Sequence, residues 1–339
     1  MRGRVLALLL ASAAASPSWP SFGRRITLTD EQLAAYDRDG VILVKGVLTG
    51  RKLRRAQRVV GPSGWSLPGW RSDGRYYDGF VFQGWRNSGV LRSVACDSTV
   101  PDLVAQVMRL GPNERLRVLK DAAFSFKPGD KGVDWHVDDK GFWPCHDSAA
   151  DEDARLEGVN VWITLSPLRA AEGGGLAVAP GSARASWCEK ARNATLDVNR
   201  PERIKPPPPS RCDQVGGTGI PLPFGAGIPS SRTLRRLERS KLLHDMEPGD
   251  ALLHSRYCYH RGERFSSAHS DAKLRYSIRY MPESGRLFNN GFEGALKAKR
   301  LQGGESLAAC GEYYPQVWPR PLWRERALIR MGRLRRDGE

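Results

Sequence analysis

The chain has 339 residues, of which 40% are hydrophobic and 27% are charged. This composition is typical of a globular protein with a core of its own, and it excludes a chain that is disordered throughout. The formal net charge of +16 favours anionic partners, such as nucleic acid, acidic membranes or acidic small molecules, without choosing among them. No apolar stretch reaches the roughly 20 residues that a membrane-spanning helix needs, so no transmembrane span is expected.

The N-terminus has the pattern of a targeting segment. Arg2 and Arg4 precede an apolar run that ends in three alanines. A basic start, an apolar run and small residues are the parts of a secretory signal, so residues 1–15 are predicted to be a signal or targeting peptide, followed by a linker at 16–26. An ordinary N-terminus and an organelle transit peptide are the alternatives. The expected location is the secretory pathway or an organelle lumen, or the cytoplasm if the leader is not functional.

The six cysteines include no CxxC pair, which argues against zinc-ribbon and thioredoxin-like sites. Buried free thiols are the expected state in a core of this size. One or two disulfide bridges are the alternative if the chain enters an oxidising lumen.

Helix signals come first along the chain. Thr29 and Gln32 have the spacing of a capping box, so a helix is predicted to begin after Thr29 and to stop at Gly40. Residues 41–44 follow as a short β-branched strand, and a very basic helix is predicted from Thr49. Its charges are interpreted as a solvated helix face.

Strand patterns dominate from Leu116 onward. The predicted strands are Leu116–Phe126, Val133–Val137, Val159–Leu165, Gly175–Ala179, Ala251–Tyr259 and Leu274–Tyr280. This spacing indicates an all-β sandwich or barrel with helices added at the front. Residues 199–231, rich in Pro and Gly, are predicted to be an inserted loop that serves as a lid or a linker. Residues 296–339 form a basic C-terminal extension, and no nucleic-acid-reading module is recognisable in it.

The strongest site pattern is formed by His136 and Asp138, with His260 far downstream. Side chains two apart on a strand point the same way, so the first two can reach one point inside a barrel. Two histidines and one carboxylate on one face of a metal leave its other positions open, which suits non-haem Fe(II). His254 has the same parity as His260 and is a rival ligand; otherwise it is a buried residue that orients the site.

Several further motifs surround these residues in a fixed order. They are Leu28–Gln32, Asp39-Gly40, Phe124–Asp130, Gly132–Asp138, Val159–Leu165, Glu172–Ser182, and Pro248–Asp250 before the strand that ends at His260. In this order the set resembles the phytanoyl-CoA dioxygenase family of Fe(II)/2-oxoglutarate oxygenases over about residues 27–285. The resemblance implies a mainly β fold, a double-stranded β-helix (jelly-roll) with flanking α-helices, in one catalytic domain at 27–295.

The resemblance also implies that His136, Asp138 and His260 hold Fe(II). The cosubstrates would be 2-oxoglutarate, which chelates the metal through its keto-acid end, and O2. Related halogenases replace the carboxylate by Ala or Gly to make room for halide, so the presence of Asp138 implies hydroxylation.

The far carboxylate of 2-oxoglutarate needs a cation. Arg275 is placed to bind it, because a guanidinium can donate two hydrogen bonds to one carboxylate. Arg279 has the same parity and is the competing residue. Asn160 and Trp162 are predicted to line the cosubstrate pocket, with core packing as an equal alternative for Trp162. Two features depart from the family. Gly262 stands where the family usually has a small polar residue, and the spacing from His260 to Arg275 is longer than is usual in the family.

Trp135, Lys140 and Trp143 are predicted to contact the substrate, together with residues 65–89 and the inserted loop. The expected activity is hydroxylation of an unactivated C–H bond in a small molecule, an acyl thioester or a protein side chain, by a protein that acts as a monomer. Two alternatives remain open: a non-catalytic jelly-roll that binds an anionic partner through its cationic surface, and a cupin-like metalloenzyme that does not use 2-oxoglutarate.

Overall fold

The structure is a computed structural model, described over residues 26–61, 67–72, 77–138, 145–146, 158–184, 231–266, 271–287 and 305–320. Lys140, Trp143, the leader at 1–15 and all but the last residue of the inserted loop lie outside the described residues. Within these ranges no helix is both long and apolar enough to span a membrane.

The first helix, α1 (Asp30–Asp39), confirms the capping box. The Thr29 hydroxyl accepts from the Gln32 amide at 3.2 Å, and the Gln32 side chain accepts from the Thr29 amide at 3.0 Å. The helix ends at Gly40, which adopts φ +69°, and a Cβ there would lie 2.9 Å from Cβ of Ala183. Glycine is therefore required by both the left-handed backbone and the close approach.

The main sheet is antiparallel. Its strands, in spatial order, are β1 (Val41–Val44), β7 (Ala251–Ser255), β5 (Val159–Thr164), β9 (Lys273–Pro282), β3 (Leu116–Phe126) and β11 (Gln316–Trp318), with β2 (Gly79–Phe82) also paired to β3. The predictions at 41–44 and at Leu116–Phe126 are confirmed to the residue. β11 brings residues of the C-terminal extension onto the edge of this sheet.

Helices cover one face of the main sheet. They are α2 (Gly50–Val60), α3 (Gly84–Asn87), α4 (Gly89–Asp97) and α5 (Val100–Val107), and with the sheet they form the largest apolar core. Of these four helices, the sequence pattern predicts only α2. On β9 the alternation is clear, because Tyr276, Ile278 and Tyr280 enter this core while the residues between them face the other way.

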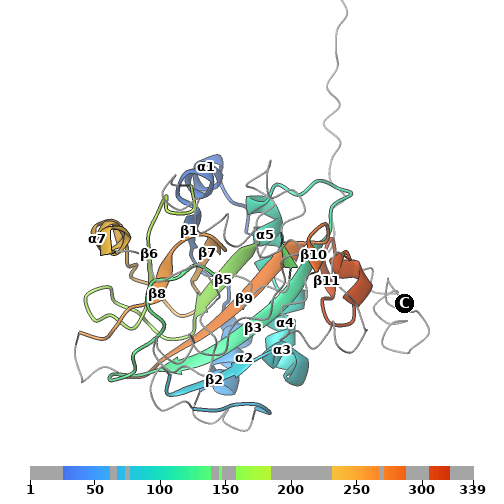
Figure 1. The fold of residues 1–339 in the computed structure, drawn as a ribbon. Helices are drawn as coiled ribbons and strands as arrows, with labels where there is room; N and C mark the ends of the chain where they lie inside the picture. The colour runs from blue at the N-terminus through green and yellow to red at the C-terminus, as the bar shows by residue number, and fades with distance from the viewer. Residues whose placement is uncertain are drawn as a thin grey trace, which may run out of the picture.

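The second sheet is small and lies on the other side of the main sheet from α3 and α4 (Figure 1). It pairs β6 (Leu176–Val178) with β8 (His260–Gly262), and a bridge between His136 and His260 extends it. Outside it lies α7 (Ser231–Ser240). Shorter elements are β4 (Cys145–His146) paired with β10 (Arg286–Leu287), and the 3-10 helix η6 (Leu307–Cys310). The two sheets with helices on the outer face confirm the predicted jelly-roll fold.

Two predicted strands differ most from the structure. Val133–Val137 reduces to a single bridge at His136, because Gly132 turns the chain at φ +61° and Asp134 binds the Trp135 amide with its side chain at 3.1 Å. The strand predicted at Ala251–Tyr259 stops at Ser255, where a turn carries the chain from the main sheet to the small one. That turn places His260 opposite His136.

Among the described residues, Cys96, Cys258 and Cys310 are in the thiol form, and the last two are buried. Burial raises the pKa of Cys258 to about 12, so this thiol is not nucleophilic at neutral pH.

Candidate active site

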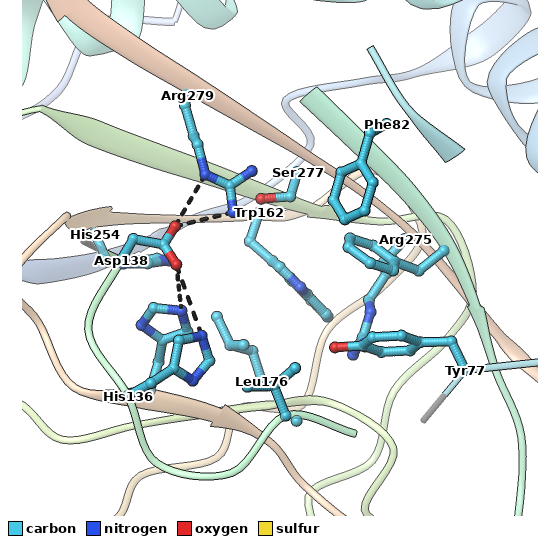
Figure 2. Close-up of a pocket in the computed structure, with 14 residues that line it drawn as sticks. Tyr77, Phe82, His136, Asp138, Trp162, Leu176, His254, Arg275, Ser277 and Arg279 are labelled. Atoms are coloured by element: carbon cyan, nitrogen blue, oxygen red, sulfur yellow. Dashed lines mark hydrogen bonds and ion pairs between the residues drawn. The ribbon is translucent and has the colours of Figure 1, made fainter. Parts of the chain in front are cut away.

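The three predicted metal ligands meet at one point. The backbones of His136 and His260 exchange two hydrogen bonds of 3.0 Å, and the amide of Asp138 donates to the carbonyl of Arg256 at 3.0 Å. Nε2 of the two histidines lies 3.6 Å and 3.7 Å from Oδ1 of Asp138 (Figure 2). One ligand atom from each residue falls within 4.8 Å of the others, so a single ion can contact all three.

The hydrogen bonds at the rear of each imidazole fix its tautomer. Nδ1 of His136 lies 2.6 Å from the carbonyl of Asp134, and Nδ1 of His260 lies 2.9 Å from that of Cys258. A carbonyl only accepts, so Nδ1 carries the proton and Nε2 presents a lone pair to the shared point. Burial lowers the pKa of both histidines, which keeps them neutral near pH 7.

The two oxygens of Asp138 have different roles. Oδ1 is buried and has no hydrogen-bond partner among the described residues. Oδ2 accepts from Nδ2 of Asn160 at 2.9 Å and from Nε of Arg279 at 3.0 Å. Burial alone would raise the pKa of Asp138, but the guanidinium of Arg279 and then the nearby imidazoles lower it well below its usual range. Asp138 is therefore an anion with one oxygen secured and the other available. This donor set fits a divalent cation.

The contacts of Asp138 correct the prediction for Asn160 and give a partner to Arg279. The sequence predicts that Asn160 lines the cosubstrate pocket, but its amide binds Asp138 and it does not line the pocket. Arg279, the competitor for the cosubstrate carboxylate, is paired with the same Asp138 oxygen at 3.0 Å. Asn160 and Arg279 are cross-strand neighbours on β5 and β9, which explains why both reach one carboxylate.

Arg275 lies at the other end of the same pocket. Its residue exposure is 3%, and its Nε and Nη1 have no hydrogen-bond partner among the described residues. Four aromatic rings surround the guanidinium, with centroids 4.8–5.8 Å from Cζ; they belong to Tyr77, Phe124, Phe126 and Trp162. Burial lowers the pKa of Arg275, yet arginine stays charged. A buried cation with unused donors is suited to an incoming carboxylate.

The pocket between these two ends is lined mainly by apolar side chains. Its lining consists of Tyr77, Phe82, Phe124, Val133, His136, Asp138, Trp162, Leu176, His254, His260, Gly262, Arg275, Ser277 and Arg279. His254 is buried behind His260, with ring centroids 4.5 Å apart, and it is not part of the group that could share a metal ion. Burial lowers its pKa to about 4, so it is a neutral packing partner of the ligand.

Trp135, predicted to contact the substrate, does not line the pocket. Its indole packs beneath α7, and its Nε1 donates to Oε1 of Glu238 at 2.8 Å. Glu238 also pairs with Arg261. Since Trp135 precedes His136 and Arg261 follows His260, one carboxylate on α7 joins the two segments that carry the histidine ligands.

Replacing Glu238 with alanine is expected to weaken metal binding severalfold, because both histidine segments lose a shared anchor. The measurement is the dissociation constant for Mn(II) or Fe(II), by anaerobic titration. Glu247→Ala is the matched control, because this exposed carboxylate pairs with Arg169, and no pair with a metal-ligand segment is present among the described residues. Equal metal affinity in the two variants would show that α7 does not hold the ligands in place.

Comparison with known proteins supports the same centre. A family model for phytanoyl-CoA dioxygenase (PhyH) matches residues 36–271. No curated protein matches the sequence closely enough to count as a relative.

Solved structures share the fold at low identity. The carbocyclase SnoK from nogalamycin biosynthesis has 18% identity and a TM-score of 0.60, over 87% of this chain and 100% of that one. The epimerase SnoN, solved with Fe3+, alpha ketoglutarate and nogalamycin RO, has 17% identity and a TM-score of 0.59, over 85% and 97%. EctD from S. alaskensis, solved with 2-oxoglutarate and 5-hydroxyectoine, has 17% identity and a TM-score of 0.53, over 77% and 78%.

The family match spans most of the chain and includes all three residues of the metal-ligand group. The chain therefore belongs to the phytanoyl-CoA dioxygenase family and is a 2-oxoglutarate-dependent non-haem iron dioxygenase.

Proposed function

We propose that this dioxygenase hydroxylates an unactivated C–H bond of a small molecule. The observation that carries the proposal is the intact carboxylate ligand. Oδ1 of Asp138 faces Nε2 of both histidines, while Arg279 and Asn160 hold Oδ2, so the aspartate occupies the position that a halide would need. EctD, which shares the fold, was solved with 5-hydroxyectoine, a hydroxylated small molecule.

When bound, iron and 2-oxoglutarate supply the oxidation: 2-oxoglutarate and O2 give succinate and CO2, and one oxygen atom converts the substrate C–H bond into C–OH. The residues of the chain provide the geometry. His136, Asp138 and His260 would hold the metal from one side, leaving its remaining positions to cosubstrate and oxygen. Arg275 would bind the far carboxylate and so set the direction of the cosubstrate.

The apolar side chains of the pocket have a second role, which is to exclude water. Phe82, Val133 and Leu176 line it beside the ligands, and Trp162 lies between the metal-ligand end and Arg275. Such side chains offer no hydrogen bond to water and so favour a dry site, in which a reactive oxidant is protected from side reactions. They also favour an apolar reacting portion in the substrate.

The first experiment measures succinate formed from 2-oxoglutarate by protein loaded with Fe(II) without oxygen and then exposed to air. We expect succinate from the wild type and from Arg86→Ala, whose guanidinium lies against Trp85 and Tyr313, outside the pocket. We expect background levels from His136→Ala, which loses a metal ligand, and from Arg275→Ala, which loses the carboxylate partner.

Other results would favour a different function for this protein. A wild type that neither retains iron nor forms succinate would favour a non-catalytic jelly-roll. Unchanged succinate formation in Arg275→Ala would contradict the cosubstrate assignment. Once a substrate is found, label from isotopically marked O2 in the product distinguishes hydroxylation from an oxidation that leaves no oxygen behind.

A further inference from the structure

A second cavity adjoins the active-site pocket at β8. It is lined by Lys131, Asp134, Arg261, Gly262 and Arg264. Its volume is about 310 Å³, at the lower end of the range of small-molecule sites, roughly 300–1,000 Å³. Gly262 also lines the active-site pocket, as does His260. Successive side chains of a strand face opposite sides, so Arg261, between these two, points away from the metal-ligand group, and the second cavity lies behind β8.

Two cations of this cavity have no counter-ion. Lys131 and Arg264 are both exposed, and neither forms an ion pair or a side-chain hydrogen bond with a residue in the described ranges. Like charges that line one cavity repel each other, and an anion bound between them removes that repulsion. The arrangement is therefore suited to an anionic ligand.

The other charges near the cavity balance one another except for Asp134. Arg261 donates from Nε to Glu263 at 3.0 Å and also pairs with Glu238 on α7. Lys241 binds Glu263 at 2.9 Å, so these two carboxylates face two cations. Asp134 is the carboxylate of the lining; its side chain is 79% exposed, and its Oδ1 lies 3.9 Å from Nη1 of Arg261. It offsets one of the two unpaired cations, which leaves the cavity with a net positive charge.

The backbone that carries the two unpaired cations is held in place. A Cβ on Gly173 would lie 2.0 Å from the carbonyl oxygen of Arg264, so the glycine backbone packs directly against this residue. On the other side, Lys131 follows a turn in which the carboxylate of Asp130 accepts from the amide of Lys127 at 2.8 Å. Only the two side chains need to be ordered when a ligand binds, which limits the entropic cost of binding.

We propose that this cavity is a second ligand site, which binds an oxyanion group such as phosphate or sulfate through Lys131 and Arg264. A guanidinium presents paired N–H donors that match two oxygens of such a group, and an ammonium adds a compact charge with three donors. The volume also accommodates an organic part attached to the oxyanion. The site requires neither iron nor 2-oxoglutarate, so it is independent of the proposed function.

The test titrates sulfate calorimetrically into the full-length protein loaded with Mn(II), with chloride adjusted to keep the ionic strength constant. We expect saturable binding by the wild type. Replacing Lys131 or Arg264 with glutamine should raise the dissociation constant for sulfate roughly three- to fivefold each, as is usual for exposed ion pairs. Glycerol 3-phosphate, titrated in the same way, should bind more tightly than sulfate if the ligand is an organic phosphate and less tightly if it is a free ion.

A variant with the opposite expected effect is Asp134→Asn. It removes the negative charge of the lining and keeps the side-chain oxygen that accepts from the Trp135 amide at 3.1 Å. We expect sulfate to bind severalfold more tightly to this variant, because the repulsion between two anions is lost. Unchanged or weaker binding would contradict the assignment of the cavity.

Two control variants separate this site from other sources of binding. Arg51→Gln removes an exposed cation on α2, which packs against β9 and β3, and Arg275→Ala removes the buried cation of the active-site pocket. Both should bind sulfate as the wild type does. Equal weakening in Arg51→Gln and Lys131→Gln would show that sulfate responds only to the net charge of the protein. Loss of binding in Arg275→Ala would place the anion in the active-site pocket, and a wild type without saturable binding would overturn the proposal outright.

Discussion

Replacing Arg279 with methionine is expected to destabilise the metal-free protein by about 3–5 kcal/mol, because it leaves a buried charge without its partner. The side chains of Arg279 and Asp138 are 7% and 2% exposed, and the guanidinium contacts Oδ2 of Asp138 through both Nε and Nη2 at 3.0 Å. Asn160 is then the remaining donor to that oxygen among the contacts described above. Methionine keeps most of the aliphatic volume, so the loss reports the charge more than the packing. The measurement is the free energy of unfolding in denaturant.

The same variant should respond more strongly to metal than the wild type. A divalent cation on Oδ1 of Asp138 compensates the carboxylate that Arg279 no longer faces, so Mn(II) should raise the melting temperature of Arg279→Met by more than it raises that of the wild type. Arg117→Met is the matched control. Its guanidinium is also buried and pairs with Glu283, but it lies away from the ligands. If the two variants gain equally from metal, Arg279 does not act on the metal-binding carboxylate.

The contribution of Asp121 to stability is expected to fall by about 3 kcal/mol as the pH rises through the interval between its unfolded pKa of 3.8 and its folded pKa of about 6. Burial raises the pKa of Asp121 from 3.8 to about 6, although Tyr276 donates to it at 2.6 Å and the Trp85 amide at 2.8 Å. The folded protein therefore holds this proton more tightly than the unfolded chain. The stabilisation is fully present below pH 4, is lost as the pH passes the folded pKa, and does not change further above it.

Asp121→Asn isolates this effect, because all other titrating groups are shared with the wild type. The amide stays neutral and can still accept from the Trp85 amide through its oxygen. The difference in unfolding free energy between the two proteins, measured in urea at intervals from pH 4 to pH 8, should change by about 3 kcal/mol and level off above pH 6. A difference that is the same at every pH would mean that Asp121 titrates normally in the folded protein.

Local sequence patterns predicted the features whose hydrogen bonds or alternation involve residues close together in the chain. The capping box at Thr29 fixed the start of α1, because its hydrogen bonds join residues three apart. The two-residue period of a strand separated Arg275, Ser277 and Arg279 from the core residues between them. The metal-ligand residues were also readable from the chain, because a histidine and an aspartate two apart are a local pattern and the motifs around His260 placed the third.

The tertiary structure alone decided what each pocket residue does. Parity places Arg275 and Arg279 on one face and cannot say which of them meets the metal ligand. That depends on register: β5 sets Asn160 opposite Arg279 and Thr164 opposite Arg275, and only the first pair lies within reach of Asp138. The register itself results from packing between segments more than a hundred residues apart, so no window of sequence contains it.

Glu238 shows the same limit. It belongs to no motif, and its contacts with Trp135 and Arg261 depend on segments brought close by folding. The sequence by itself thus determined the family, the fold and the metal-ligand set, because these rest on short-range patterns. The three-dimensional packing decided which side chains contact the metal-ligand residues and which lie at the other end of the pocket, because hydrogen bonds and ion pairs depend on distances that only the folded chain defines.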